Sequence, residues 1–294
     1  MRKTLAVLIP LMLAGCASLP STSKTDSRLI LAEPMAVPFQ SEVELVRLEQ
    51  ILARADLNKE QRAEVIYHRG VVYDSVGLRA LANRDFHLAV KLNPKMADAY
   101  NFIGIQAISD EEFDQAYDAL DTAIALDPKP DYAYLNRGIA LYYGDRPELG
   151  VPDLKKFVSL QPDDPYRIVW MYLLEDAVDP AKAMTELNAN AKHLHGHAWA
   201  NQLVLLYQGK LSESDFINGL KDGIDSNQAL AERLCEAYFY LGKLHQRHGD
   251  TGEAINFFKL ALTTNVKDFI EYRYARLEIK RIRRQLAQAQ QKAG

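Results

Sequence analysis

Three consecutive stretches of equal length decide the fold of this chain. They read AEVIYHRGVVYDSVGLRALANRDFHLAVKLNPKM over residues 63–96, ADAYNFIGIQAISDEEFDQAYDALDTAIALDPKP over 97–130 and DYAYLNRGIALYYGDRPELGVPDLKKFVSLQPDD over 131–164. Aligned with one another, they share Gly at position 8, a small residue at position 20 and Pro at position 32. A fixed step of 34 residues with these marks predicts a repeated pair of α-helices.

The glycines at position 8 indicate how the two helices of a pair pack. Gly70, Gly104 and Gly138 fall in the middle of expected helices, where Gly costs about 1 kcal/mol relative to Ala. Three such costs at one spacing are explained if the partner helix approaches too closely for a side chain. Proline ends each repeat because it cannot continue a helix. The pattern is the tetratricopeptide-repeat signature, and it predicts an all-α superhelix with capping helices at both ends.

The repeat register fades after residue 164 and returns late in the chain. Helices without the Gly, Ala and Pro marks are expected at 165–177, 180–191, 197–207 and 212–223, which makes 165–234 a region of divergent helical pairs. A further repeat is expected over 235–268, with Gly242 at position 8, Ala254 at position 20 and Val266 in place of the proline. Residues 269–294 are expected to form one long capping helix that solvates the last apolar face.

The N-terminus resembles a bacterial lipoprotein signal. A positive start is followed by an apolar stretch too short to span a bilayer and then by Leu13-Ala14-Gly15-Cys16. We expect cleavage after residue 15 and lipidation of Cys16; the alternative is an ordinary secretory signal with an incidental cysteine. Ala17 follows, and without Asp there the sorting rules for such lipoproteins favour the Gram-negative outer membrane, facing the periplasm. Residues 16–39 then form the lipidated cysteine and a Ser/Thr/Pro-rich tether.

The N-terminal helical region, 40–62, carries an apolar stripe broader than a free surface helix exposes. The stripe includes Val46, Ile51 and Leu52, which are the residues expected at a dimer contact. It must cover the first repeat or a second copy of the chain, and the two possibilities are compatible.

Composition and charge exclude some classes of function. With 48% hydrophobic and 25% charged residues the chain is globular, and removal of Arg2 and Lys3 with the leader takes its net charge from −4 to −6. This balance argues against general nucleic-acid binding, which requires a basic surface. Neither a phosphate-binding loop nor a GxSxG or HExxH motif is present, so no catalytic site, cofactor or metal is predicted.

A few histidines, the second cysteine and the basic tail leave alternatives open. His193, His195 and His197 alternate and mark a turn between helices, with a metal site as the less favoured reading. His245 and His248 are one turn apart, but no carboxylate is obviously placed to complete a site. Cys235 is expected to be a small buried apolar residue, or else to have a redox or intermolecular role. The last helix is rich in Lys and Arg, which form either a strip for an anionic envelope polymer or acidic partner, or a solvated face.

Repeat geometry predicts which side chains line the concave side and contact a partner. They are mixed aromatic, aliphatic and polar residues of the first helix of each pair, which suits recognition of a peptide or helix. The predicted groove residues are Tyr67, Val71, Asp74, Asn101, Ile105, Tyr132, Leu135, Asn136, Ile139 and Tyr142.

Several segments also resemble one family, the NlpI-like lipoproteins of Gram-negative bacteria. They are YDSVGLRALA at 73–82, LNRGIALYYG at 135–144 and FYLGK at 239–243. The resemblance implies a non-enzymatic, homodimeric periplasmic adaptor that presents the peptidoglycan endopeptidase MepS to the tail-specific protease Prc. It also implies binding of other cell-wall hydrolases and an influence on division. A scaffold for another envelope machine, such as outer-membrane protein assembly, is the alternative; an enzyme is disfavoured.

Overall fold

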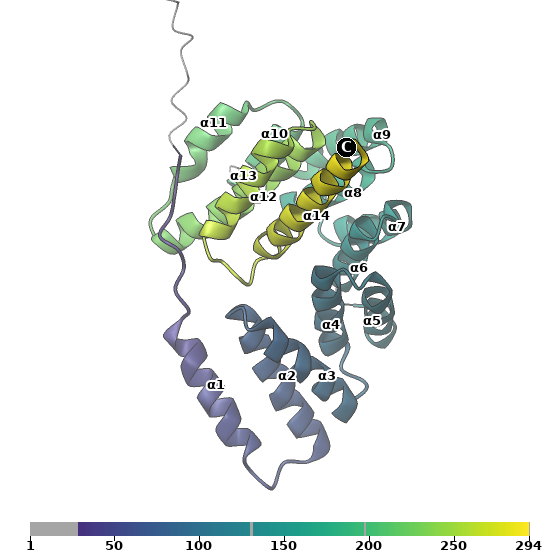
Figure 1. The fold of residues 1–294 in the computed structure, drawn as a ribbon, viewed down its shortest axis with the longest axis vertical. Helices are drawn as coiled ribbons and strands as arrows, with labels where there is room; N and C mark the ends of the chain where they lie inside the picture. The colour runs from purple at the N-terminus through teal and green to yellow at the C-terminus, as the bar shows by residue number, and fades with distance from the viewer. Residues whose placement is uncertain (1–28, 130–131, 197, 294) are drawn as a thin grey trace, which may run out of the picture.

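The structure is a computed structural model that describes residues 29–129, 132–196 and 198–293. Within these ranges helices are the only regular secondary structure. Successive helices pack as antiparallel neighbours into a curved array (Figure 1). The first seven helices are Phe39–Leu52 (α1), Lys59–Ser75 (α2), Arg79–Leu92 (α3), Ala97–Asp110 (α4), Phe113–Leu126 (α5), Tyr132–Tyr143 (α6) and Pro147–Leu160 (α7). The remainder are Pro165–Asp176 (α8), Pro180–Asn190 (α9), Ala191–His193 (η1), Asn201–Tyr207 (α10), Glu213–Asn218 (α11), Gly219–Lys221 (η2), Asn227–Arg247 (α12), Thr251–Thr263 (α13) and Ile270–Ala293 (α14).

The close helix approach predicted from the glycines is present. A β-carbon built on Gly138 would lie 1.8 Å from Leu154 Cδ2, and one on Gly104 would lie 2.5 Å from Leu120 Cγ. Real β-carbons do not approach other atoms so closely, which explains why glycine holds this position. The same close helix contact occurs in the repeat expected over 235–268, because a β-carbon on Gly242 would lie 2.6 Å from the Phe258 ring.

Several helices begin or end at other residues than the repeat register predicts. Helix α2 begins at Lys59, before the expected repeat boundary at residue 63, because Asn58 and Gln61 form a reciprocal capping box at its start. The helix expected at 197–207 is shorter and starts at Asn201. The segment 212–223 divides into α11 and the short η2, and α12 starts at Asn227 rather than near residue 235.

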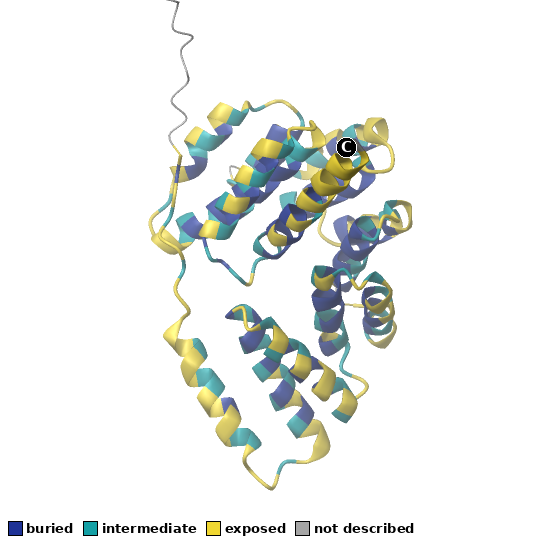
Figure 2. Cartoon of the chain, viewed as in Figure 1, coloured by how far each residue is buried: buried dark blue, intermediate teal, exposed yellow. Residues whose placement is uncertain are grey.

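The last helix covers the last repeat and also reaches across to the earlier ones. Helix α14 lies on the inner side of the array and contacts α4, α12 and α13, and its first half is buried (Figures 1 and 2). A buried ion pair, Lys243 with Glu278 at 2.5 Å, joins α12 to α14, and the Tyr143 hydroxyl donates to the same carboxylate at 2.9 Å. Helix α14 therefore holds the inner surface of the superhelix together.

Several cations of the basic strip form ion pairs within the chain, which neither reading of the sequence predicted, although much of the strip is exposed as the solvated-face reading expects. Arg273 pairs with the buried Asp74 at 2.7 Å. Lys280 lies 2.6 Å from Glu111, which Arg284 also contacts. These basic side chains therefore pair with the first repeats of the same chain, while those of Lys280 and Arg284 remain 58% and 49% exposed to solvent.

Residues 29–37 are not a free tether. This extended segment, which we call the strap, lies against α12 and the end of α13. The Asn227 side chain accepts from the Glu33 N–H at 2.9 Å and donates to its carbonyl at 3.0 Å. Ile30 is buried in the main core, and the Met35 N–H donates to the Thr264 carbonyl at 2.9 Å. The strap thus joins the beginning of the described chain to its C-terminal third.

Helix α1 covers the first repeat, as the first of the two readings predicts. Leu48 is buried, and Leu52 packs with Ile66 at the base of α2. The opposite face is open, with Val46 55% and Phe39 72% exposed. The predicted dimer residues are therefore divided between the two faces of the helix.

A candidate protein-binding groove

The principal candidate site is a cavity of about 580 Å³ on the inner side of the array, which we call the concave groove. Helices α2, α4 and α6 form one wall, with Phe157 of α7, and α8, α12, α14 and the loop before α14 form the other. Apolar and aromatic side chains dominate its walls. They include Phe102, Ile105, Tyr132, Leu135, Phe157 and Trp170.

Polar groups in the groove are held by specific hydrogen bonds. Asn136 Nδ2 donates to Asn101 Oδ1 at 3.0 Å. On the opposite wall the Tyr166 hydroxyl donates to Glu236 at 2.7 Å. The groove therefore offers an apolar surface with fixed polar groups, which is the usual composition of a ligand-binding cavity.

Two carboxyl groups of the groove have pKa values far above the ordinary range. Burial, followed by repulsion from Glu271, raises the pKa of Glu236 to about 8. Burial raises the pKa of Glu271 to about 7, although the Tyr240 hydroxyl donates to it at 2.9 Å. At neutral pH both groups are partly protonated, so this wall can donate as well as accept hydrogen bonds.

Six of the ten predicted groove residues line this cavity. The six are Asp74, Asn101, Ile105, Tyr132, Leu135 and Asn136. Tyr132 is 62% exposed and lies beside the Phe157 ring, at 6.1 Å between centroids. By contrast, Asp74 is 5% exposed and forms an ion pair with Arg273, and Asn136 is hydrogen-bonded to Asn101. Tyr132 is thus the most accessible of the six, while Asp74 and Asn136 organise the wall.

The other four predicted groove residues lie elsewhere for reasons of packing. Tyr67 packs against Phe86 and Phe102 in a small core at the first repeat, which Val71 flanks. Ile139 is 1% exposed in the main core. The hydroxyl of Tyr142 accepts from the buried Lys243 at 2.8 Å.

The wall formed by the second half of the chain was missed by sequence reasoning. Tyr166 and Trp170 come from the divergent region, Glu271 from the last helix and Glu236 from the late repeat. Only Glu236 had a usable signal, because it falls within the repeat expected over 235–268. Cys235 itself is buried, and burial raises the pKa of its thiol well above the ordinary value, which confirms the prediction of a small buried side chain.

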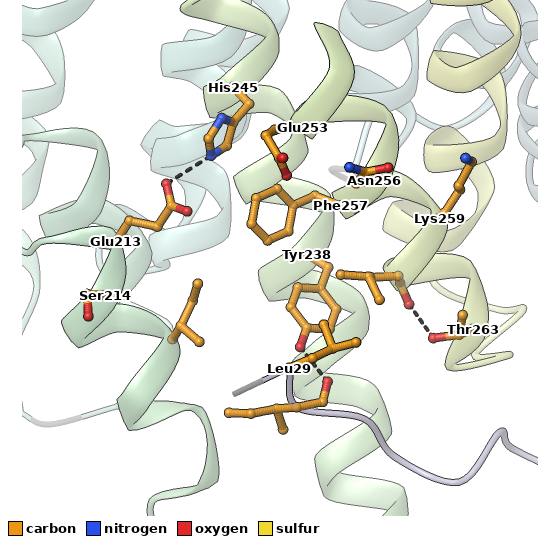
Figure 3. A pocket seen from close by; sticks show the side chains of 13 residues that line it. Leu29, Glu213, Ser214, Tyr238, His245, Glu253, Asn256, Phe257, Lys259 and Thr263 are labelled. Carbon is orange, nitrogen blue, oxygen red and sulfur yellow. Dashed lines mark hydrogen bonds and ion pairs between the residues drawn. The ribbon is translucent and has the colours of Figure 1, made fainter. Parts of the chain in front are cut away.

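A second cavity of about 740 Å³, which we call the outer cleft, opens between α11 and α13 over α12 (Figure 3). Its apolar lining includes Ile217, Phe257 and Leu260. The start of the strap, at Leu29, lies at its lower end in Figure 3. Glu213 and Glu253 stand at the rim. The outer cleft shares no lining residue with the concave groove.

The structure gives His245 the carboxylate neighbours that the sequence did not reveal. His245 Nε2 lies 2.9 Å from Glu213 Oε2, and its Nδ1 lies 3.6 Å from Asp250 Oδ2. His193 and His195 are exposed near η1, and His197 lies outside the described residues, as does Cys16. No group of three or more His, Cys, Asp or Glu side chains suited to a metal occurs in the described ranges.

Within the described residues no helix has the length and apolar character needed to cross a bilayer. No protein-family model matches the chain. Among solved structures it is similar to YrrB, described as a tetratricopeptide-repeat protein with an unusual peptide-binding site, at 16% identity and TM-score 0.44 over 82% of this chain and 99% of that one. It is also similar to a tetratricopeptide-repeat protein from Parabacteroides merdae (14% identity, TM-score 0.49, 83% and 78% covered). A third similar structure is the Cut9–Hcn1 hetero-tetramer of the APC/C (17% identity, TM-score 0.50, 83% and 46% covered). With its paired helices and its 34-residue step, the chain has the fold of a tetratricopeptide-repeat solenoid.

Proposed function

We propose that the chain is a lipid-anchored adaptor of the Gram-negative envelope with no catalytic activity of its own. It binds a MepS-like peptidoglycan endopeptidase and a Prc-like tail-specific protease together and so speeds degradation of the endopeptidase. By this route it coordinates cell-wall hydrolases in growth and division. Its location is the inner leaflet of the outer membrane, facing the periplasm, through lipid on Cys16. The sequence resemblance and the solenoid fold support this proposal.

The concave groove is the observation that carries the binding role. It combines apolar walls with fixed hydrogen-bonding groups in about 580 Å³, which suits an extended or helical polypeptide segment. The exposed ring of Tyr132 at its mouth can anchor such a segment, because a rigid aromatic side chain loses little entropy on binding.

The outer cleft supplies a second, separate surface. Two separate surfaces allow the chain to hold protease and substrate at once, which raises their effective concentration toward about millimolar. A large excess of adaptor then inhibits, because the protease and the endopeptidase occupy different copies.

Self-association through α1 is part of the proposal. Phe39, Val43 and Val46 lie on one face of α1 and are 72%, 50% and 55% exposed. Because Leu52 already packs on the first repeat, these three residues form the dimer face in place of the set Val46, Ile51 and Leu52. Light scattering at micromolar concentration tests this: the wild type is expected to be a dimer and Val43→Ser with Val46→Ser a monomer. A monomeric wild type refutes it.

The central experiment measures the half-life of the endopeptidase with the protease alone, with adaptor and with excess adaptor. A soluble chain lacking residues 1–16 is expected to shorten the half-life, and Tyr132→Ala to weaken this effect while leaving the melting temperature unchanged. Leu149→Ala is the matched control, because Leu149 is also about half exposed (50%) and lines neither cavity. Equal half-lives with and without adaptor refute the proposed function.

The alternative is a scaffold for another envelope machine, such as outer-membrane protein assembly. A pull-down from envelope extract separates the two. Recovery of a protease with cell-wall hydrolases supports the adaptor, and recovery of assembly factors supports the alternative.

A further inference from the structure

A small pocket with strong positive charge lies where the start of α14 meets the first repeat, next to the concave groove. Its volume is about 70 Å³, which suits a single carboxylate-sized group. We call it the basic pocket. Its charged lining residues are Arg79, Lys267, Arg273, Arg276 and Asp74.

The single acidic residue of the lining does not balance the four basic ones. Asp74 is already occupied, because it accepts from Arg273 at 2.7 Å and from Gln106 at 2.5 Å. Arg79 is partly compensated from outside the lining by Asp110, at 3.1 Å. Burial, with repulsion from Arg273, nevertheless lowers the pKa of Arg79 below its ordinary value. The pocket therefore retains an excess of positive charge.

Arg273 adds an independent indication of a ligand. Its side chain lines the pocket and is 9% exposed as a residue, and its Nη2 donates to Asp74. Its Nε and Nη1 are buried and have no hydrogen-bond partner within the described part of the chain. Unsatisfied donors on a buried guanidinium are costly, and an anionic oxygen that reaches either of these two atoms relieves part of that cost.

The basic pocket is continuous with the concave groove, because Asp74 and Arg273 line both cavities. We propose that the basic pocket binds a carboxylate carried by the polypeptide segment that lies in the concave groove. Arginine suits this role because its planar guanidinium matches the two carboxylate oxygens. The carboxylate belongs either to the C-terminus of the segment or to an Asp or Glu side chain. The inference rests on the proposed binding role of the groove, but not on the identity of the partners.

The first test uses acetate as the probe and the soluble chain lacking residues 1–16, labelled with ¹⁵N. Titration at constant ionic strength, balanced with chloride, is expected to shift the Arg273 Nε–H signal in a saturable manner. Arg276→Gln combined with Lys267→Gln is expected to weaken acetate binding by about tenfold, because two cationic partners are lost. Arg283→Gln is the matched control, since Arg283 is an exposed cation of the same helix outside the pocket. A signal unaffected by acetate overturns the proposal.

The second test distinguishes the two sources of the carboxylate. Three decapeptide libraries are compared for binding: one with a free C-terminus and no acidic side chains, the same library amidated, and an amidated library with one fixed internal Glu. Stronger binding of the first or the third library than of the second supports the proposal and names the source. Equal binding of all three overturns it, even where the chain still accelerates degradation. The converse outcome is that the chain prefers carboxylate-bearing peptides and yet leaves the half-life of the endopeptidase unchanged. That result refutes the adaptor function and leaves the basic pocket proposal standing.

Discussion

The buried ion pair between Lys243 and Glu278 gives a quantitative test of how α14 is held. Both side chains are 2% exposed, with Nζ 2.5 Å from Oε1. The Tyr142 hydroxyl accepts from the same ammonium at 2.8 Å. Tyr143 and Gln246 donate to the carboxylate at 2.9 Å each. Burial alone lowers the pKa of Lys243, but attraction to Glu278 and Tyr142 raises it above its ordinary range, so the ammonium keeps its charge.

The change is Lys243→Met, which keeps the length of the side chain and removes the ammonium. Removing one partner of a buried pair leaves the other charge uncompensated and costs about 3–5 kcal/mol. Since Tyr143 and Gln246 still donate to Glu278, we expect the free energy of unfolding to fall by about 3 kcal/mol. The double change Lys243→Met with Glu278→Leu removes both charges and is expected to cost less than the single one, because an apolar pair can replace a buried ion pair.

Urea denaturation at pH 7, followed by the fluorescence of the buried Trp170, measures these free energies. The control is Lys155→Met, which breaks a pair with Glu186 that is 47% and 28% exposed and is expected to cost less than about 1 kcal/mol. Two results refute the reasoning: Lys243→Met costing no more than the control, or the double change costing as much as the sum of the two single changes.

Three further predictions address packing, pH and processing. Gly138→Leu is expected to lower the stability by about 3 kcal/mol, because even a β-carbon would meet Leu154 at 1.8 Å; an unchanged melting temperature contradicts the close contact. The pKa values of Glu236 (about 8) and Glu271 (about 7) are raised from 4.5 in the folded chain. Between pH 4.5 and about pH 8 the folded chain therefore binds more protons than the unfolded chain. Stability therefore falls as pH rises from about 4.5 through 8, so the melting temperature should be lower at pH 8.5 than at pH 6, and Glu271→Gln should reduce this difference; a rising melting temperature contradicts it. Cys16→Ala is expected to leave an unprocessed precursor that takes up no palmitate analogue, and label retained on this variant contradicts lipidation.

The regular repeats could be predicted because their packing leaves a local mark. Each close contact joins a glycine to a side chain on the next helix, as Gly104 does with Leu120, and the partners are only 16 residues apart. Short-range constraints of this kind recur at a fixed step and can be recognised in one sequence. The same register pointed to side chains that line one wall of the concave groove, among them Ile105 and Leu135.

The opposite wall and the place of α14 could not be predicted, because contacts between distant segments determine them. Arg273 and Asp74 are 199 positions apart, and Glu278 and Tyr143 are 135 apart. Charge periodicity shows that a helix has a basic face but does not show which acidic residues meet it. The strap was missed for the same reason, since its backbone is held by Asn227, 194 positions from Glu33.

The strap also determines how mechanical force enters the molecule. A pull on the chain ahead of Leu29 reaches first the hydrogen bonds between the strap and the C-terminal third, those of Asn227 with Glu33 and of Thr264 with Met35. The tension passes from there into α12 and α13, whose contact is among the most extensive in the array. Helix α1 and the first repeat follow the strap along the chain, so they stay unloaded while these bonds hold. A molecule held at its N-terminal end can therefore bear load without distorting the repeats that form the first wall of the concave groove.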